Sequence, residues 1–166
     1  RKTVAVQGLG FVGSAMVAAL TQATDKKGNL LYNVIGVDLC NKQNYWKIAR
    51  ANEGKPPVVS SDKKISDAYI NAKKNKNFYA TYSNYTYTKS DIVVIDLHLD
   101  IKKKTLGKAQ NYIFTYKDYL EAIKNVANNI KENSTIIVET TVPPGTTEKI
   151  IYPIFKECFK NRGLDV

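Results

Sequence analysis

Short apolar runs alternate along the chain with longer stretches in which apolar residues recur every three or four positions. The short runs are typical of buried strands, and the longer stretches are typical of helices with one apolar face. The expected strands are Val4–Gln7, Asn33–Val37, Phe78–Tyr82, Ile92–Ile95 and Thr135–Val138, with a last one opening at Leu164–Val166. The expected helices cover residues 14–20, 42–52, 63–74 and 116–130, and residues Ser60–Asp62 are expected to cap the third of them. A last helix, capped by Thr146 or Thr147, is expected to run to about Phe159.

This alternation of strands and helices predicts an α/β fold. Strands joined through right-handed helical crossovers form a parallel sheet covered by helices on both faces. The sequence therefore predicts a Rossmann-type doubly wound parallel sheet, and 166 residues suffice for a single domain with its own core. Residues 96–112 are expected to form a loop, and Ser83–Lys89 is polar and fits no regular element clearly.

The first strand runs directly into Gly8–Gly13, which reads G-L-G-F-V-G, and then into a helical pattern of small residues. This is the G-x-G-x-x-G spacing in the strand–turn–helix setting of dinucleotide-binding folds. Gly8 allows a sharp turn before Leu9, Gly10 allows a pyrophosphate to approach the backbone, and Gly13 allows the helix to lie close to the strand. The amides of Phe11 and Val12 would then point at the phosphates from the helix N-terminus.

The second expected strand ends in Asp38, at the tip where an acid can accept hydrogen bonds from the adenosine ribose. Such a carboxylate would repel a 2′-phosphate, so the sequence predicts NAD rather than NADP as the cofactor. The alternative is an ordinary acid that caps the following helix.

Several loops are expected to meet because the carboxyl ends of parallel strands lie at one edge of the sheet. These are Gly8–Gly13, Asp38, Leu97–Ile101 and Thr140–Val142. The run Lys102–Lys104 beyond the fourth expected strand is either a basic clamp for phosphate or a solvated turn, and the solvated turn is favoured.

The composition is that of a globular protein, with 43% apolar residues, 24% charged residues and a net charge of +10. The lysines are scattered over turns and polar helix faces, so we expect no nucleic-acid partner. No run is long enough to span a membrane. Cys40 and Cys158 form no disulfide framework, and His98 has no neighbouring ligand, so no metal site is expected and a reduced, cytoplasmic setting fits.

Five segments in the same order resemble the N-terminal NAD-binding domain of the UDP-glucose/GDP-mannose dehydrogenase family. They are G-L-G-F-V-G, G-V-D at 36–38, N-E-G-K-P-P at 52–57, S-D-I-V-V-I at 90–95 and E-T-T-V-P-P-G-T-T-E at 139–148. The last segment is the most specific, and it is similar to members that act on UDP-N-acetyl amino sugars.

The resemblance implies a cytoplasmic oxidoreductase of polysaccharide biosynthesis that oxidises the C6 hydroxyl of a nucleotide sugar to a carboxylate with two NAD. It implies a UDP-sugar as substrate and a homo-oligomer for the full enzyme. It places the pyrophosphate on Gly8–Gly13 and the ribose on Asp38, with Lys42 or Gln43 near the adenosine. It assigns the nicotinamide end to Thr140–Val142, where Thr141 either holds substrate or an ordered water, or simply satisfies backbone groups.

Two departures from the family pattern change these expectations. A small residue and Thr-Pro usually follow the fourth strand, whereas this chain has Leu97-His98-Leu99-Asp100, so the wall of the cofactor cleft must differ. His98 either faces the dinucleotide or only packs. The catalytic cysteine, lysine and glutamate of the family have no match before Val166, so the chain is expected to be the cofactor part of a longer enzyme, inactive by itself.

Two other functions stay open at this point. One is the cofactor domain of another dehydrogenase, of the 6-phosphogluconate or hydroxyacyl type, although such a domain has no reason to carry the proline-rich segment 139–148. The other is a non-catalytic module that senses a nucleotide or binds nucleic acid through its basic surface.

Overall fold

The computed structural model describes residues 1–99, 101–103, 112–114 and 117–165. Its internal contacts divide the chain into two compact units. The first, the sheet unit, comprises Arg1–Asp96 and Ile130–Glu139. The second, the helical unit, comprises Leu97–Asn129 and Thr140–Val166.

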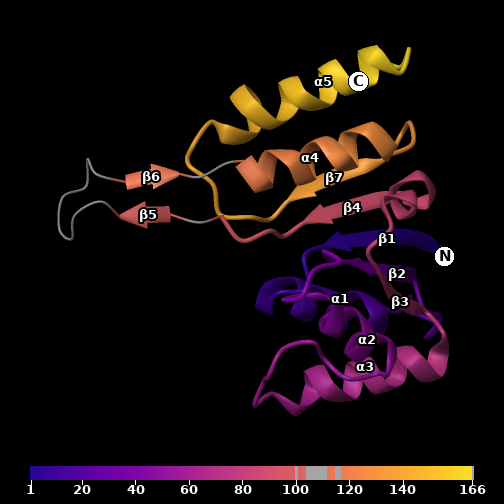
Figure 1. Ribbon diagram of the computed structural model, residues 1–166. Coiled ribbons are helices and arrows are strands. Elements are labelled where there is room, and N and C mark those ends of the chain that lie inside the picture. Colours follow the sequence, from indigo (N-terminus) through magenta and orange to yellow (C-terminus); the bar gives the residue numbers. More distant parts are fainter. Residues whose placement is uncertain (100, 104–111, 115–116, 166) are drawn as a thin grey trace. The chain divides into compact units, whose positions relative to one another are not determined.

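The sheet unit is built on five parallel strands in the order β3-β2-β1-β4-β7, with β1 at the centre (Figure 1). In register, Val6 of β1 lies opposite Gly36 of β2 and Val94 of β4. The order β3-β2-β1 is one half of a doubly wound dinucleotide-binding sheet, and β4 and β7 begin the other half, so the predicted Rossmann-type parallel sheet is confirmed. The strands are β1 (Lys2–Gln7), β2 (Tyr32–Val37), β3 (Phe78–Thr81), β4 (Ile92–Ile95) and β7 (Thr135–Val138).

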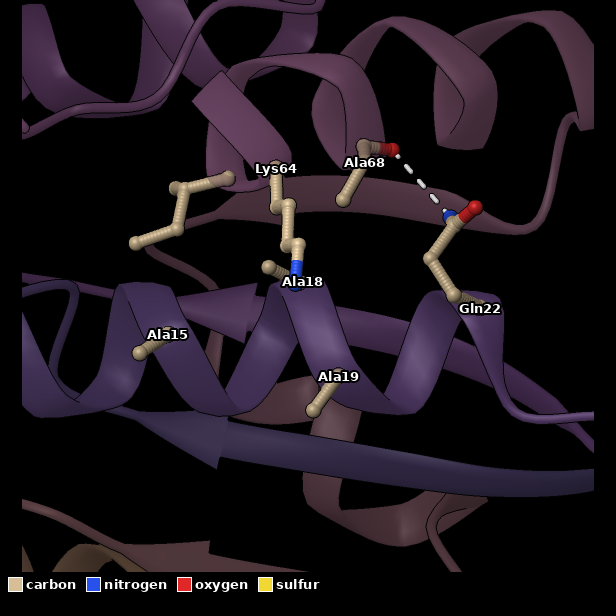
Figure 2. Close-up of a pocket in the computed structure, with 7 residues that line it drawn as sticks. Ala15, Ala18, Ala19, Gln22, Lys64 and Ala68 are labelled. Atoms are coloured by element: carbon tan, nitrogen blue, oxygen red, sulfur yellow. Dashed lines mark hydrogen bonds between the residues drawn. The ribbon is translucent and has the colours of Figure 1, made fainter. Parts of the chain in front are cut away.

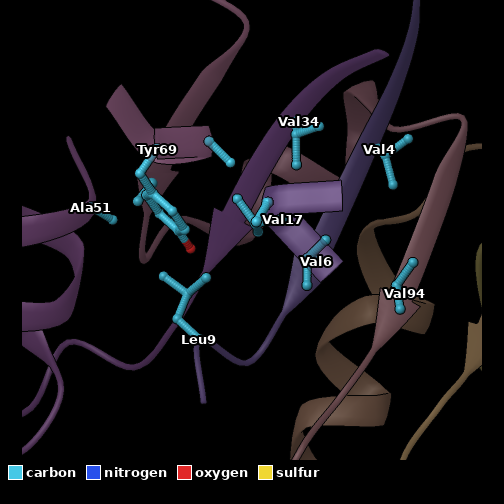
Figure 3. Close-up of a cluster of buried hydrophobic side chains, with 11 residues drawn as sticks. Val4, Val6, Leu9, Val17, Val34, Ala51, Tyr69 and Val94 are labelled. Carbon is cyan, nitrogen blue, oxygen red and sulfur yellow. The ribbon is translucent and has the colours of Figure 1, made fainter. Parts of the chain in front are cut away.

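Two helices of the sheet unit pack together and bury its main apolar core. The cluster joins side chains of β1, β2 and β4 to side chains of α1 and α3, and Figure 3 shows Val17 of α1 and Tyr69 of α3 within it. Asp62 caps α3 by accepting a hydrogen bond from the Lys64 amide at 2.9 Å, as the sequence predicts. The helices of this unit are α1 (Phe11–Gln22), α2 (Tyr45–Asn52), α3 (Lys63–Asn75) and the 3₁₀-helix η1 (Asn84–Lys89).

Asn52, the first residue of the N-E-G-K-P-P segment, protects the free edge of the sheet. Its side-chain amide donates to the Ala80 carbonyl of β3 at 2.9 Å, and its side-chain oxygen accepts from the Ala80 amide at 2.7 Å. Because β3 is an edge strand, these two bonds replace the neighbour that the strand lacks. The segment therefore has a structural role at this edge.

The helical unit contains a short antiparallel hairpin and two packed helices. The Arg162 guanidinium donates to the carbonyl of Ala127 at 2.9 Å, and the rings of Phe155 and Phe159 lie with centroids 6.4 Å apart. The elements are β5 (Ile101–Lys103), β6 (Tyr112–Phe114), α4 (Lys117–Asn129), the π-helix η3 (Thr147–Ile151) and α5 (Tyr152–Asn161).

Some predicted elements differ from the structure. The helix expected from Lys42 begins at Tyr45, because the Asn41 side chain accepts hydrogen bonds from the amides of Gln43 and Asn44 and holds a turn there. The segment 96–112, expected to be a loop, contributes strands of the β5–β6 hairpin. Ser83–Lys89 is mostly 3₁₀-helix, capped by the Ser83 hydroxyl.

The last helix also differs from its prediction. Thr146 is its N-cap residue but makes no side-chain capping hydrogen bond, and the first turn is a π-helix rather than an α-helix. Leu164 and Asp165 form no strand. Four positions named in the predictions lie outside the described residues: Asp100, Lys104, Tyr116 and Val166. The side chains of the Lys102–Lys104 run lie outside the description as well.

Candidate functional site

The turn after β1 has the backbone geometry that the glycine motif predicts. Gly8 has φ of +100°, a region that favours glycine, and its amide donates to the Val37 carbonyl at 2.8 Å. The turn directs Leu9 into the core (Figure 3), where a Cβ on Gly36 would lie 2.8 Å from a Leu9 methyl. Leu9 was predicted to contact the cofactor, but its side chain is buried and its amide donates to the Asp38 carboxylate at 3.1 Å.

Gly13 and Gly10 are glycines for different reasons. A Cβ on Gly13 would lie 1.9 Å from the Gly8 carbonyl oxygen, so any side chain there would push α1 off the turn. A Cβ on Gly10 would meet no protein atom within 4 Å, and φ of −75° suits any residue. The fold itself therefore requires Gly13 but does not require Gly10, as expected where a ligand approaches the backbone.

The N-terminus of α1 presents amides that the protein leaves unpaired. Phe11 and Val12 are 74% and 52% exposed, and Gly10 at the N-cap supplies no side-chain acceptor. Within the described ranges, neither the Phe11 nor the Val12 amide has a hydrogen-bond acceptor in the protein. Free amides at the positive end of a helix dipole bind anions such as phosphate.

Asp38 lies beside this turn, as predicted. Its carboxylate accepts hydrogen bonds from the Leu9 amide at 3.1 Å and the Leu39 amide at 2.7 Å, and the Lys47 ammonium lies 3.7 Å away. The alternative in which Asp38 caps the following helix is wrong, because α2 begins only at Tyr45 and Asp38 bonds elsewhere. Both carboxylate oxygens are thus oriented by the motif and by the strand end.

Gln43, expected near the adenosine, is exposed and held by its backbone. Its amide donates to the Asn41 side chain at 3.1 Å, and its carbonyl accepts from the Trp46 indole at 2.6 Å. Its side chain, like that of Lys42, is exposed.

The remaining predicted site residues belong to the helical unit. The Leu97 amide donates to the Thr140 hydroxyl at 2.9 Å, which joins the segments that follow β4 and β7. Thr140 is buried, whereas Thr141 and His98 are exposed. The structure therefore brings Leu97 and Thr140 together, assigns Thr140 a structural bond and leaves the side chain of Thr141 accessible.

The sequence profile of the UDP-glucose/GDP-mannose dehydrogenase family, NAD binding domain, matches residues 2–166. The chain belongs to this family. The chain is the NAD-binding domain of this nucleotide-sugar dehydrogenase family. It is similar to the GDP-mannose 6-dehydrogenase of Pseudomonas putida, with 27% identity over 170 residues. It is also similar to the UDP-N-acetyl-D-mannosamine dehydrogenase of Methanococcus aeolicus, with 25% identity over 158 residues.

The match covers nearly all of this NAD-binding domain but about a third of each relative: 98% and 34% for the first, 95% and 32% for the second. Among solved structures, the NDP-N-acetyl-D-galactosaminuronic acid dehydrogenase of Methanosarcina mazei matches with a TM-score of 0.84 at 22% identity, over 99% of this chain and 32% of that one. The GDP-mannose dehydrogenase of Pseudomonas aeruginosa matches with a TM-score of 0.73 at 22% identity, over 93% and 32%. At such identities the structures establish the shared fold.

Two charged residues of the NAD-binding domain were not predicted to belong to the site. Lys47 pairs with Asp38 across the loop that precedes α2, and no local sequence pattern marks such a pair. Asp96 directly follows β4 and lies beside Gly13, where a Cβ would be 3.0 Å from its carboxylate oxygen. A charge placed immediately after the apolar run of β4 was the signal that could have revealed Asp96.

Burial raises the pKa of the Asp96 carboxyl above its usual value, and the negative charge of Glu139 raises it further. A hydrogen bond from the Gly13 amide acts in the opposite direction. The folded domain therefore binds a proton at Asp96 more readily than the unfolded chain does, and this residue contributes less stability as the pH rises through its folded pKa.

The sheet unit also has a shallow groove between α1 and α3. Ala15, Ala18 and Ala19 of α1 and Lys64 and Ala68 of α3 line this groove. Figure 2 shows Gln22 at its end, where the side-chain amide donates to the Ala68 carbonyl at 3.3 Å. Apart from Lys64, its lining carries no charged group that could orient a reacting ligand.

Among the described helices, none is both long enough and apolar enough to cross a bilayer.

Proposed function

We propose that this domain binds NAD on the turn Gly8–Gly13 and on Asp38, and that it serves a nucleotide-sugar 6-dehydrogenase. The proposal is carried by two features of the same turn. The amides of Phe11 and Val12 have no acceptor in the described protein, and the Asp38 carboxylate is oriented by the Leu9 amide. The residues fit the cofactor: the amides match a pyrophosphate, and the carboxylate matches a ribose diol.

Each residue has a defined part in this proposal. Gly10 leaves room for the pyrophosphate. Asp38 accepts hydrogen bonds from the ribose, and the Lys47 ammonium, 3.7 Å away, holds its carboxylate in place. Asp38 also disfavours a 2′-phosphate. Bound NAD supplies a hydride acceptor. Thr140 holds Leu97 at the segment that we assign to the nicotinamide. Thr141 offers an accessible hydroxyl to substrate or water. We assign His98 to the nicotinamide region as well.

We extend the proposal to the longer protein from the family and its relatives. The complete enzyme oxidises the C6 hydroxyl of a nucleotide sugar, by preference a UDP-sugar, to a carboxylate with two NAD. It acts in the cytoplasm in polysaccharide biosynthesis and assembles as a homo-oligomer. The 166-residue chain alone then binds NAD without producing NADH from nucleotide sugars.

Replacing Asp38 by asparagine tests the cofactor assignment. Asp38→Asn keeps an oxygen for the Leu9 amide but loses the charge that holds the ribose, so we expect NAD to bind about tenfold more weakly, as for a lost charge-assisted hydrogen bond. The wild-type chain should bind NADP poorly, and the affinity for NADP should stay the same or rise in Asp38→Asn. Isothermal titration calorimetry with both dinucleotides measures the two affinities.

The matched control is Asp67→Asn, which removes the same charge from an exposed position on α3. It should leave both affinities unchanged. Equal binding of NAD and NADP by the wild-type chain would refute the proposed selectivity, and the absence of binding by the wild-type chain would refute the NAD site itself.

A further inference from the structure

Asp96 lies at the same edge of the sheet as the glycine turn. Its amide donates to the Gln7 carbonyl at 2.9 Å, which extends the pairing of β4 with β1 by one residue beyond the strands. Since Gln7 is followed directly by the Gly8 turn, this bond fixes Asp96 next to the start of α1. The position of Asp96 is therefore set by the sheet and not by a loose loop.

The Asp96 carboxylate uses part of the same anion-binding end of α1 that NAD requires. It accepts a hydrogen bond from the Gly13 amide, and its oxygen lies 3.0 Å from the position of a Gly13 Cβ. Phe11, Val12 and Gly13 are the first three residues of α1, so their amides point out of one helix end. One of these three amides is already bound to a negative charge of the protein.

The surroundings of Asp96 do little to neutralise that charge. Glu139, which follows β7 and donates its amide to the Ile95 carbonyl at 2.9 Å, adds a second negative charge. Within the described part of the chain, the groups that act on the Asp96 carboxyl are Glu139 and the Gly13 amide, and no lysine or arginine is among them. A further anion at this helix end would meet an acid that is already poorly compensated.

We propose that Asp96 competes with the cofactor's pyrophosphate for the N-terminus of α1, so that NAD binding is coupled to uptake of a proton by Asp96. As a carboxylate, Asp96 holds the Gly13 amide and repels the pyrophosphate. As a carboxylic acid it carries no charge, and its proton can be donated to a phosphate oxygen. The inference rests on the proposed function, because it concerns the affinity of the same NAD site.

Calorimetric titration of NAD into the 166-residue chain at pH 5, 6, 7 and 8 tests the coupling, because the pKa of the Asp96 carboxyl is raised above its ordinary value. The wild-type affinity should fall as the pH rises through the pKa of this carboxyl, by at most about tenfold per pH unit, which is the limit for one linked proton. Asp96→Asn, which keeps an acceptor for the Gly13 amide without the charge, should bind equally well at all four values and about tenfold more tightly than wild type at pH 8. Titrations in buffers of different ionisation enthalpy should show proton uptake by wild type and none by Asp96→Asn.

Two further variants separate Asp96 from other titrating groups. Glu139→Gln removes the neighbouring negative charge, which raises the pKa of Asp96. The plot of NAD affinity against pH should therefore keep its shape and move to lower pH. His98→Gln removes the single histidine of the chain and should keep the pH dependence.

A wild-type affinity that does not change with pH, or an Asp96→Asn affinity equal to or below that of wild type at pH 8, would overturn the competition while leaving the NAD site intact. Loss of the pH dependence in His98→Gln would also overturn it. If neither protein binds NAD at any pH, the proposed function fails, and this inference fails with it. Should Asp96→Asn fail to fold, the wild-type pH profile and its proton uptake decide the question alone.

Discussion

Replacing Gly13 by alanine is expected to lower the free energy of unfolding by about 3 kcal/mol, at the upper end of the range for overpacking a filled site. The added Cβ would lie 1.9 Å from the Gly8 carbonyl oxygen, a backbone atom held by the turn. Neither partner can move aside without separating α1 from β1. For a chain of this size the melting temperature should fall by roughly 10 °C, as followed by circular dichroism.

The matched control for Gly13→Ala is alanine at Gly10, three residues earlier in the same turn. A Cβ there meets no protein atom within 4 Å, so the melting temperature should fall far less. If Gly13→Ala melted as wild type does, the close approach of α1 to the turn would be wrong, and the geometric basis of the site would be lost.

Gly10→Ala is expected to leave the fold intact and to weaken NAD binding by about 100-fold, which corresponds to about 2.7 kcal/mol. The open space above Gly10 is where a pyrophosphate would approach the backbone, and a methyl group would occupy it. Because Gly10 is the N-cap of α1, the alanine should also cost less than about 1 kcal/mol of stability. Calorimetry with NAD and thermal denaturation measure the two effects separately.

Gly10→Ser distinguishes a steric effect from a capping effect. Serine restores a good N-cap and should recover the stability lost in Gly10→Ala, yet its Cβ still fills the space above the turn. We expect Gly10→Ser to bind NAD as poorly as Gly10→Ala. Wild-type affinity in either variant would show that the dinucleotide does not lie over Gly10.

The fold could be predicted from the sequence because the buried strands carry unbroken apolar runs. Ile92–Ile95 and Thr135–Val138 have the predicted bounds. The first is largely buried, as an unbroken apolar run indicates, whereas the second, also predicted to be buried, is the edge strand β7 and alternates exposed with half-buried residues. The glycine motif was equally informative, because a strand, a turn and a helix follow one another without interruption. Asp38 was located by the same logic, at the end of β2.

The sequence was less informative where geometry depends on groups that are distant along the chain. The Asp38–Lys47 pair and the Gly13–Asp96 contact are through-space arrangements that no periodicity records. The start of α2 was misjudged because the Asn41 side chain forms a turn that competes with the helix. The bond from the Leu97 amide to the Thr140 hydroxyl is also a contact between distant parts of the chain, and the assignment of Thr140 to the nicotinamide end stays a prediction.

Asp96 stands directly before Leu97–Asp100, the stretch in which this chain departs from the family pattern. In the proposed site, an acid at the end of β4 changes the electrostatics of the turn Gly8–Gly13, whereas His98 is exposed and Asp100 lies outside the described residues. The affinity for NAD and its pH dependence are therefore the properties that this acid should control.

The central claim is that the free amides at the start of α1 bind the pyrophosphate of NAD. Proton–nitrogen correlation spectra of the labelled chain, recorded during a titration with NAD at pH 6, test it most directly. The account predicts large, saturable shifts of the Phe11 and Val12 amide signals, while the amide of Ala72, buried within α3, stays unchanged. Binding of NAD that leaves the Phe11 and Val12 signals where they were would contradict it.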